Sequence, residues 1–452
     1  MRNNVLLFVL DSIRADKFTG ENKTSITPNL DNLMEKGAYF EQAISSADST
    51  LLAITSLFTG KHPFKTGIRS ERFNKLKEGI PTLFKNLSDN NYHHYGFNPT
   101  VTKTIGLIPD FENDDSHYDY HFDMNDGLGE KIIEKLKSGL KEPWCFYIHA
   151  NDLHFPIKVP KEFLEEKYGS NNFEKQLSAI DPWIGKIFEN IDFKNTVIVV
   201  TADHGSFIPS ISTKNGTINF EIDGKKQQLI SKISKKTPSF LKPLKTRLFL
   251  KKEKIGMDSM VKKIEKMNLK PHQKRELLWM RSDLDKVLFD SNVKVPLLII
   301  ANGLKENITI SQQVRQVDIF PTILDILGIQ NIEKVDGQSL VPLINGNNVE
   351  ELPAYMESTP LIQMKANEVV GIRTSEFKYF RDREDKTKRI HLYDLKNDVA
   401  EDYNIAEKRD IVKKMENIIE ELYKENIEND EAEFSEEETK AIEEELKKLG
   451  YD

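Results

Sequence analysis

The sequence contains very little cysteine and no long hydrophobic run. Its 452 residues include one cysteine, Cys145, which excludes an internal disulfide and a cysteine-based zinc site. No segment approaches the roughly 20 consecutive apolar residues that a membrane-spanning helix requires. The first apolar run, Val5 to Leu10, is too short for the core of a signal peptide and ends at Asp11. We therefore expect an intracellular, cytoplasmic protein without a membrane span.

The chain also lacks an excess of positive charge. It has 64 Lys and Arg residues against 72 Asp and Glu residues, for a net charge of −8 at pH 7. Such a charge favours solubility and provides no general attraction for nucleic acid, so no nucleic-acid partner is expected. The length suggests either two or three domains, or one large α/β domain with a smaller appendage.

Two segments depart from this average charge. Ser231 to Arg275 carries about 15 basic residues and about 3 acidic ones, within a stretch at 206–290 that interrupts the strand and helix pattern. We interpret residues 206–290 as a solvated surface insertion in preference to a dedicated anion-binding surface, although its charge would attract anions. Residues 413–452 carry about 15 acidic and about 6 basic residues, which predicts an acidic helical tail.

Apolar runs alternate with amphipathic segments along most of the chain. Buried strands are predicted at 5–10, 144–149, 196–200 and 295–300, and helices at 27–37, 51–58, 172–191 and 316–328. The alternation predicts an α/β fold with a largely parallel central sheet flanked by helices, in a catalytic domain spanning 1–345. Further strands at 369–381 and 389–395 predict a smaller C-terminal α+β subdomain, at 346–452, with a small antiparallel sheet.

Polar side chains follow the predicted strands. Asp11 ends the first strand, Asp152 and His154 follow the strand at 144–149, and Asp203-His204 follows the β-branched run 197–200. The carboxyl ends of parallel strands meet at one edge of a sheet, which is where ligands bind. The sequence therefore predicts a polar site at this edge.

A divalent cation fits these groups. We expect one ion, Mn, Zn, Ca or Mg, held by the side chains of Asp11, Thr50, Asp203 and His204. Thr50 begins a predicted helix, where free backbone N–H groups favour an anion. The ion would lower the pKa of the Thr50 hydroxyl and neutralise charge on a phosphate or sulfate ester. His154 is a candidate for protonating a leaving group or donating to a non-bridging oxygen. Taken singly, Thr50 is explained as a helix cap and His154 as a loop residue. Because all of these candidates fall at the same edge of the predicted sheet, we favour a catalytic site.

The order of the motifs resembles the sulfatase family of the alkaline phosphatase superfamily. Residues 4–16 are similar to the first metal-binding strand of that family, and residues 201–205 to its second metal motif. Matching blocks follow in family order at 27–31, 56–63, 294–297, 317–322, 336–340, 373–379, 392–398 and 449–451. The resemblance implies an alkaline-phosphatase-like fold.

The resemblance also implies roles for individual residues. It assigns Asp11, Asp203 and His204 to a metal ion, and it makes Thr50 the nucleophile position. His154 would contact substrate or transfer a proton. Weaker candidates for contacts to a small anionic ester substrate are Arg14, Lys61 and Asp152.

The nucleophile position departs from the sulfatase pattern. Sulfatases carry Cys or Ser in a Cys/Ser-x-Pro-x-Arg setting and oxidise it to formylglycine, whereas this chain has Thr50-Leu51-Leu52-Ala53-Ile54. Threonine cannot form the aldehyde because its β-carbon already bears a methyl group. Ser12 also stands where many sulfatases place a second metal-binding Asp.

These departures favour the branch with a threonine nucleophile, which resembles phosphodiesterases and phosphotransferases. We therefore expect a metal-dependent hydrolase of phosphate mono- or diesters, or a phosphoryl transferase. The first alternative is a sulfuric ester hydrolase, a sulfatase that lacks the formylglycine Cys or Ser. The second is a non-catalytic protein that binds an anionic partner through the basic insertion at 206–290.

Overall fold

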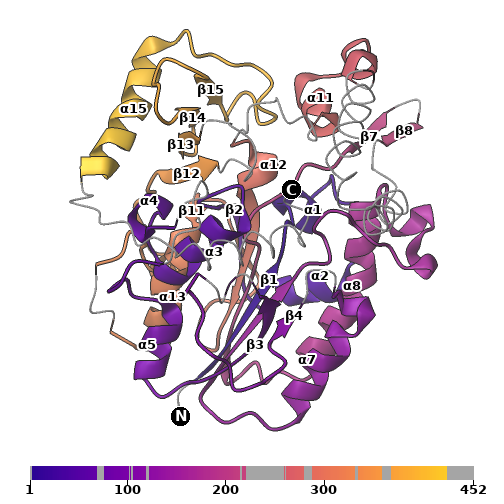
Figure 1. Cartoon of the computed structure of the whole chain (residues 1–452), viewed down its shortest axis with the longest axis vertical. Coiled ribbons are helices and arrows are strands. Elements are labelled where there is room, and N and C mark those ends of the chain that lie inside the picture. Colours follow the sequence, from indigo (N-terminus) through magenta and orange to yellow (C-terminus); the bar gives the residue numbers. More distant parts are fainter. Residues whose placement is uncertain are drawn as a thin grey trace, which may run out of the picture.

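The computed structural model has a large β-sheet at its centre, with helices on both faces (Figure 1). It describes residues 3–68, 76–100, 102, 105–118, 122–213, 216–219, 259, 261–278, 288–330, 334–358 and 368–424. Most of the predicted basic segment, and the predicted acidic tail from residue 425 onward, lie outside these ranges.

The central sheet is mostly parallel. Its strands in spatial order are β10 (Ile308–Ile310), β2 (Ala38–Ile44), β9 (Lys294–Ile300), β6 (Thr196–Thr201), β1 (Asn4–Leu10), β5 (Trp144–Ala150), β3 (His93–Pro99) and β4 (His117–Tyr118), with β11 (Val314–Arg315) beside β2. Strand β1 pairs in parallel with β5 and β6, whereas β9 runs antiparallel to β2 and β6. The α/β class expected from the sequence is confirmed.

Burial explains why the inner strands are so apolar. Every residue of β1, β5 and β6 is buried, as expected for parallel strands covered by helices on both faces. The register pairs Val9 of β1 with His149 of β5 and with Thr201 of β6. The three strands therefore end at nearly the same level, and the residues that follow them lie together.

Helices cover the two faces of the central sheet. On one side lie α2 (Pro28–Met34), α7 (Leu128–Lys137) and α8 (Asn172–Phe188), and on the other α3 (Thr50–Thr59), α5 (Leu83–Asp89) and α13 (Ile319–Ile326) (Figure 1). The shorter elements are α1 (Ala15–Phe18), α4 (Pro63–Thr66), η1 (Met124–Asp126), η2 (Lys161–Phe163), η3 (Glu166–Tyr168), β7 (Ser210–Thr213), β8 (Gly216–Asn219), α11 (Pro271–Leu277), α12 (Asp290–Val293), η5 (Gln316–Asp318) and α14 (Val341–Ile344).

A second sheet lies toward the C-terminal end of the described chain. It is antiparallel, in the order β12 (Ala354–Ser358), β13 (Val369–Arg373), β14 (Phe377–Asp382) and β15 (His391–Asp394). Helix α15 (Arg409–Lys424) packs on it through the buried Met415 and Ile419. A bridge between Ala47 and Glu357 ties this sheet to the loop that precedes α3. The second sheet therefore contacts the loop that leads into α3.

A buried charge cluster joins α12 to the second sheet. The Asp290 carboxylate accepts hydrogen bonds from Arg373, at 3.0 Å, and from Lys378, while Lys378 also lies 2.7 Å from Glu401. Burial alone would raise the pKa of Asp290, but the charges of Arg373 and Lys378 outweigh it and hold that pKa well below its ordinary value. This cluster positions the segment that packs against the candidate site.

Replacement of Asp290 with Asn is expected to destabilise the fold by about 3–5 kcal/mol, because two buried cations lose their partner. Since the pKa of Asp290 is lowered on folding, its contribution is present above about pH 4 and is lost as the pH falls further. Urea denaturation at pH 7 and pH 3 checks both statements. The matched control is Asp385→Asn, which removes an exposed pair with Lys388 and should have little effect at either pH.

Candidate active site

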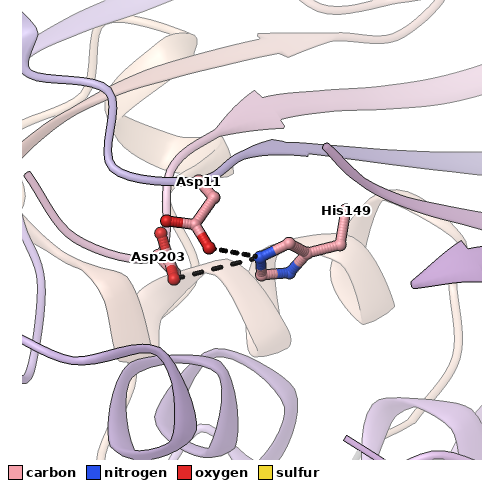
Figure 2. Close-up of side chains that lie close together, drawn as sticks. All are labelled: Asp11, His149 and Asp203. Atoms are coloured by element: carbon pink, nitrogen blue, oxygen red, sulfur yellow. Dashed lines mark hydrogen bonds and ion pairs between the residues drawn. The ribbon is translucent and has the colours of Figure 1, made fainter. Parts of the chain in front are cut away.

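The ends of three neighbouring strands bring two carboxylates and an imidazole together. Asp11 follows β1, Asp203 lies just beyond β6, and His149 is the penultimate residue of β5. The Nε2 atom of His149 lies 3.2 Å from Asp11 Oδ2 and 4.0 Å from Asp203 Oδ2, and all three side chains are buried (Figure 2). The predicted convergence of Asp11 and Asp203 is therefore present, with a third member that the sequence interpretation did not include.

Asp203 is held by backbone donors on one oxygen only. Its Oδ1 atom accepts hydrogen bonds from the backbone N–H groups of Ser12, at 3.1 Å, and His204, at 2.8 Å. Its Oδ2 atom is buried and has no hydrogen-bond partner among the described residues. A buried carboxylate oxygen without a donor is costly, and a cation in this position would remove that cost.

Ser12 orients Asp11 through its hydroxyl group. The Ser12 Oγ atom donates to Asp11 Oδ1 at 2.6 Å, and the Ser12 backbone has a positive φ of 65°, a region that non-glycine residues rarely occupy outside constrained sites. Burial raises the pKa of Asp11, but the hydrogen bond from His149 and the nearby histidine charges outweigh it, so the pKa lies below its ordinary value. Asp11 is therefore an anion that presents its Oδ2 atom to the cluster.

Thr50 meets the cluster through His204. Thr50 is the first residue of α3, and its Oγ1 atom lies 3.3 Å from His204 Nε2. The His204 Nδ1 atom donates to the Gly205 carbonyl at 2.7 Å, so the Nε2 atom of the neutral ring carries the lone pair. Burial lowers the pKa of His204, but Asp203 and then Asp11 raise it above its ordinary value. In the neutral ring, the Nε2 lone pair of His204 faces both Thr50 and Asp203, whose Oδ2 atom lies at 3.5 Å.

The spacing of these donor atoms fits a common divalent ion. Ligand atoms about 2.1 Å from one ion lie roughly 3.0–3.5 Å from their neighbours. Here the successive separations are 3.2 Å from Asp11 to His149, 4.0 Å from His149 to Asp203, 3.5 Å from Asp203 to His204 and 3.3 Å from His204 to Thr50. Asp11, His149 and Asp203 each place a ligand atom within 4.8 Å of the other two, so small side-chain adjustments would bring these three onto one ion. His204 and Thr50 would join that ion after larger adjustments, and the unpartnered Asp203 oxygen lies in the middle of the series.

His149, which the sequence interpretation did not include among the site residues, is distinguished in the sequence by its basic side chain. It has the one basic side chain in the otherwise mostly apolar run Trp144-Cys145-Phe146-Tyr147-Ile148-His149-Ala150. In the structure, this side chain faces the carboxylates of Asp11 and Asp203. The sequence interpretation considered only residues beyond the strand end. The pairing of Val9 with His149, which brings this imidazole level with Asp11, is a long-range contact that the sequence alone does not report.

His154 is half-buried and lies near enough to this cluster for the charges of Asp11 and Asp203 to act on it. Its Nδ1 atom donates to the Phe155 carbonyl at 2.8 Å, which leaves Nε2 as the acceptor atom of the neutral ring. Burial lowers the pKa of His154, against the opposing charges of Asp11 and Asp203. The neutral form therefore dominates near pH 7 in the ion-free protein, and this form takes up a proton before it can donate one from Nε2.

Arg14 lies beside the site but is paired with carboxylates. Its guanidinium contacts Asp16 at 2.8 Å and Glu276 of α11 at 2.7 Å, and Glu276 also accepts a hydrogen bond from the backbone of Ile208 at 2.8 Å. Arg14 thereby attaches α11 to the segment that follows the Asp203-His204 motif. The role of Arg14 in substrate contact stays a prediction.

A hollow lies next to this attachment. Its lining is mostly apolar and consists of Leu153, Phe155, Ile157, Asn172, Phe173, Ser206, Phe207, Ile208 and Pro209. The lining residues flank His154 on one side and follow Gly205 on the other.

The two remaining predicted substrate contacts are engaged elsewhere in the structure. Lys61 donates from Nζ to the Lys334 carbonyl at 2.7 Å. The Asp152 Oδ1 atom accepts from the Met124 backbone at 3.0 Å and from Gln176 at 3.3 Å. Burial and the neighbouring Asp123 raise the pKa of Asp152, which favours its neutral form. Substrate contact by either residue stays a prediction.

Gly205 permits a close approach of two backbones. A Cβ atom at this position would lie 2.2 Å from the Ser291 carbonyl oxygen, and the Gly205 N–H group donates to the Asn292 carbonyl at 2.7 Å. We expect Gly205→Ala to lower stability by about 1–3 kcal/mol and to displace His204, whose ring is anchored on the Gly205 carbonyl. Thermal denaturation together with metal titration checks this. Unchanged stability and unchanged metal binding in Gly205→Ala would contradict the close-approach explanation.

The fold and this donor cluster define an alkaline-phosphatase-like α/β protein with a candidate metal centre. Residues 3–329 match the family model described as Sulfatase, and residues 282–429 match the model described as N-sulphoglucosamine sulphohydrolase, C-terminal. The first match covers most of the chain. The protein therefore belongs to the sulfatase family, whose members are hydrolases that bind a divalent metal ion.

Curated relatives match over limited stretches. Arylsulfatase K of Danio rerio is 32% identical over 122 residues, which is 26% of this chain and 23% of that protein. N-acetylglucosamine-6-sulfatase of Homo sapiens is 43% identical over 60 residues, or 13% of this chain and 11% of that protein. The chain thus spans about a quarter or less of the length of these relatives.

Solved structures match over nearly the whole chain. The phosphonate monoester hydrolase of Agrobacterium radiobacter has a TM-score of 0.65 and 17% identity, covering 94% of this chain and 95% of that one. A protein solved in complex with its substrate D-glucosamine-2-N,6-O-disulfate has a TM-score of 0.63 and 14% identity, covering 98% and 99%. These likenesses confirm the predicted fold. In the part of the chain that the structure describes, helices fall short of the length and apolar character needed to cross a bilayer.

Proposed function

We propose that this protein is a metal-dependent sulfuric ester hydrolase in which Thr50 occupies the nucleophile position. The observation that carries the proposal is the series of contacts from the Asp11, His149 and Asp203 group to His204, whose Nε2 atom lies 3.3 Å from the Thr50 hydroxyl oxygen. The family membership and the names of the curated relatives, which are sulfatases, support a sulfate ester over the phosphate ester that the sequence interpretation placed first.

Thr50 acts as an ordinary oxygen nucleophile in this proposal. A divalent cation bound at the cluster lowers the pKa of a hydroxyl that it contacts and offsets charge on the ester. The Thr50 Oγ1 atom attacks sulfur, the S–O bond to the leaving alcohol breaks, and the alcohol departs with a proton. Water then attacks the sulfur of the sulfated threonine, and the products are hydrogen sulfate and the free Thr50 hydroxyl.

His154 is the candidate proton carrier for these two steps. Its Nε2 atom is the acceptor in the neutral ring, and its Nδ1 atom is fixed on a carbonyl. It takes up the proton that Thr50 releases and passes it to the leaving alkoxide, and it reverses these roles when water attacks. The hydrogen bond from Nδ1 to the Phe155 carbonyl orients the ring for this exchange.

A phosphate or phosphonate ester is the second candidate substrate. The observation that favours it is Thr50 itself, because a threonine alkoxide attacks phosphorus directly and its adduct is resolved by water. The likeness to a phosphonate monoester hydrolase concerns the fold alone at 17% identity.

The test compares matched leaving groups. The purified protein, loaded with zinc or manganese, is assayed with 4-nitrophenyl sulfate, 4-nitrophenyl phosphate and bis(4-nitrophenyl) phosphate. The proposal predicts that kcat/KM is highest for the sulfate ester, and that intact-protein mass spectrometry finds a sulfate adduct in the wild type that Thr50→Ala lacks. A phosphate ester turned over at least about tenfold faster would replace the sulfate proposal with the second candidate. Absence of turnover with every ester, in protein that binds metal, would overturn both.

A further inference from the structure

His149 gives the candidate metal centre a nitrogen donor inside the sheet. The imidazole is fully buried on β5, with its Nε2 atom facing Asp11 Oδ2 and Asp203 Oδ2 (Figure 2). The Nε2 atom of His204 lies 3.5 Å from Asp203 Oδ2, so this residue together with the Asp11, His149 and Asp203 group offers two imidazole nitrogens and two carboxylate oxygens. Ser12, which has no carboxylate, binds Asp11 instead of adding an oxygen to this set.

This donor set differs from an all-oxygen site. Calcium and magnesium are held by carboxylates, carbonyls and water, whereas imidazole suits zinc and other first-row transition metals. A site with two imidazoles and two carboxylates therefore favours a transition metal by its chemistry. The buried position of His149 limits its replacement by water.

The ring of His149 is oriented as a metal ligand requires. Its Nδ1 atom lies 2.7 Å from the Tyr147 hydroxyl, on the side of the ring opposite the carboxylates. When Nε2 coordinates a metal, the Nδ1–H group donates to a second residue that fixes the tautomer, and the Tyr147 oxygen is placed to accept. Tyr147 is itself buried against Phe58, so its hydroxyl is held in place.

We propose that His149 is a metal ligand and that it makes this centre selective for zinc-like ions over calcium and magnesium. The inference rests on the proposed function in that the same centre would bind the ester. Its test uses binding alone and needs no substrate, so that a failure to hydrolyse esters and a failure of metal selectivity are separate results.

The experiment measures affinities for Zn²⁺, Mn²⁺ and Ca²⁺ by competition with chromophoric chelators on metal-stripped wild-type protein and variants. The wild type is expected to bind Zn²⁺ at least about 100-fold more tightly than Ca²⁺, as imidazole donors favour zinc. His149→Gln should reduce that ratio at least about tenfold, and Tyr147→Phe should weaken Zn²⁺ binding by about 10-fold through loss of the oriented tautomer. His94→Gln is the matched control, because His94 is a buried histidine of the neighbouring strand that contacts Ser88.

A spectroscopic readout separates ligation from a structural role. The visible absorption of the Co²⁺-loaded protein should change in His149→Gln and stay unchanged in His94→Gln, with thermal denaturation confirming that both variants fold. Should His149→Gln fail to fold, Tyr147→Phe supplies the same comparison. Equal or tighter binding of Ca²⁺ by the wild type would overturn the proposal. So would a zinc affinity and a cobalt spectrum that His149→Gln leaves unaltered, since His149 would then only hydrogen-bond Asp11 and Tyr147.

Discussion

Replacing Thr50 with Ala is expected to lower kcat by about 10³- to 10⁶-fold, the range for removal of a covalent nucleophile, while the fold stays intact. Thr50 occupies the first position of α3, its side chain is half-buried, and Ser49 provides the cap position. Alanine is well tolerated in a first helical turn. The loss would therefore arise from the missing Oγ1 atom and not from unfolding.

Two further variants test this interpretation of Thr50. Thr50→Ser keeps a hydroxyl at the same position and should retain activity within about tenfold, because only a methyl group is removed. Thr55→Ala removes a hydroxyl from the same helix, where it donates to the Leu51 carbonyl at 2.6 Å, and should leave kcat unchanged. Steady-state kinetics of all three variants, with circular dichroism as the folding check, decide the matter. Activity of Thr50→Ala within tenfold of the wild type would exclude Thr50 as the nucleophile.

The central sheet was predictable from local sequence. Strands β1, β5 and β6 are buried on both faces, so each appears as an unbroken apolar run. Their parallel pairing places Asp11 and the Asp203-His204 motif at one edge, as the strand-end rule predicts. The rule works here because each polar residue comes directly after a run whose length fixes its level in the sheet.

Other features depend on pairings that no local pattern reports. Strand β9 is as apolar as its neighbours, so its sequence does not show that it runs antiparallel to β2 and β6. His149 lies within a strand, and its partners Asp11 and Asp203 are 138 and 54 positions away from it in the sequence. Arg14 pairs with Glu276, which comes from a segment far along the chain, and its contact with substrate stays a prediction. Long-range contacts decide each of these cases.

The sequence interpretation of the chemistry depended on a single substitution. Thr50 excludes formylglycine on chemical grounds, and from this the sequence analysis favoured phosphate over sulfate esters. The family match gives more weight to the sulfate alternative. The chemistry of one side chain restricts the mechanism but does not identify the ester, and the hollow beside His154 is lined by residues distant in sequence.

Replacing Asp203 with Asn is expected to lower metal affinity at least about 100-fold and kcat/KM at least about 10³-fold, because it removes a central anionic ligand. In the metal-free protein, by contrast, the substitution should leave the stability of the fold unchanged or increase it. Without a cation, the carboxylates of Asp203 and Asp11 lie close together beside the Nε2 atom of His149, and Asp203 Oδ2 has no donor among the described residues. Asparagine relieves this repulsion and still offers an oxygen to the backbone donors of Ser12 and His204.

The metal-free Asp203→Asn protein should therefore melt at the same temperature as the metal-free wild type, or higher. Added Zn²⁺ should raise the melting temperature of the wild type, since an ion that binds only the folded state stabilises it, and should leave the variant unchanged. Asp181→Asn is the control, because this buried carboxylate accepts from the backbones of Asn29 and Leu30 away from the cluster. It should melt lower than the wild type in both conditions and keep the zinc-induced rise. If Asp203→Asn instead loses stability without metal and retains the zinc response, Asp203 serves the fold and the proposed centre is wrong.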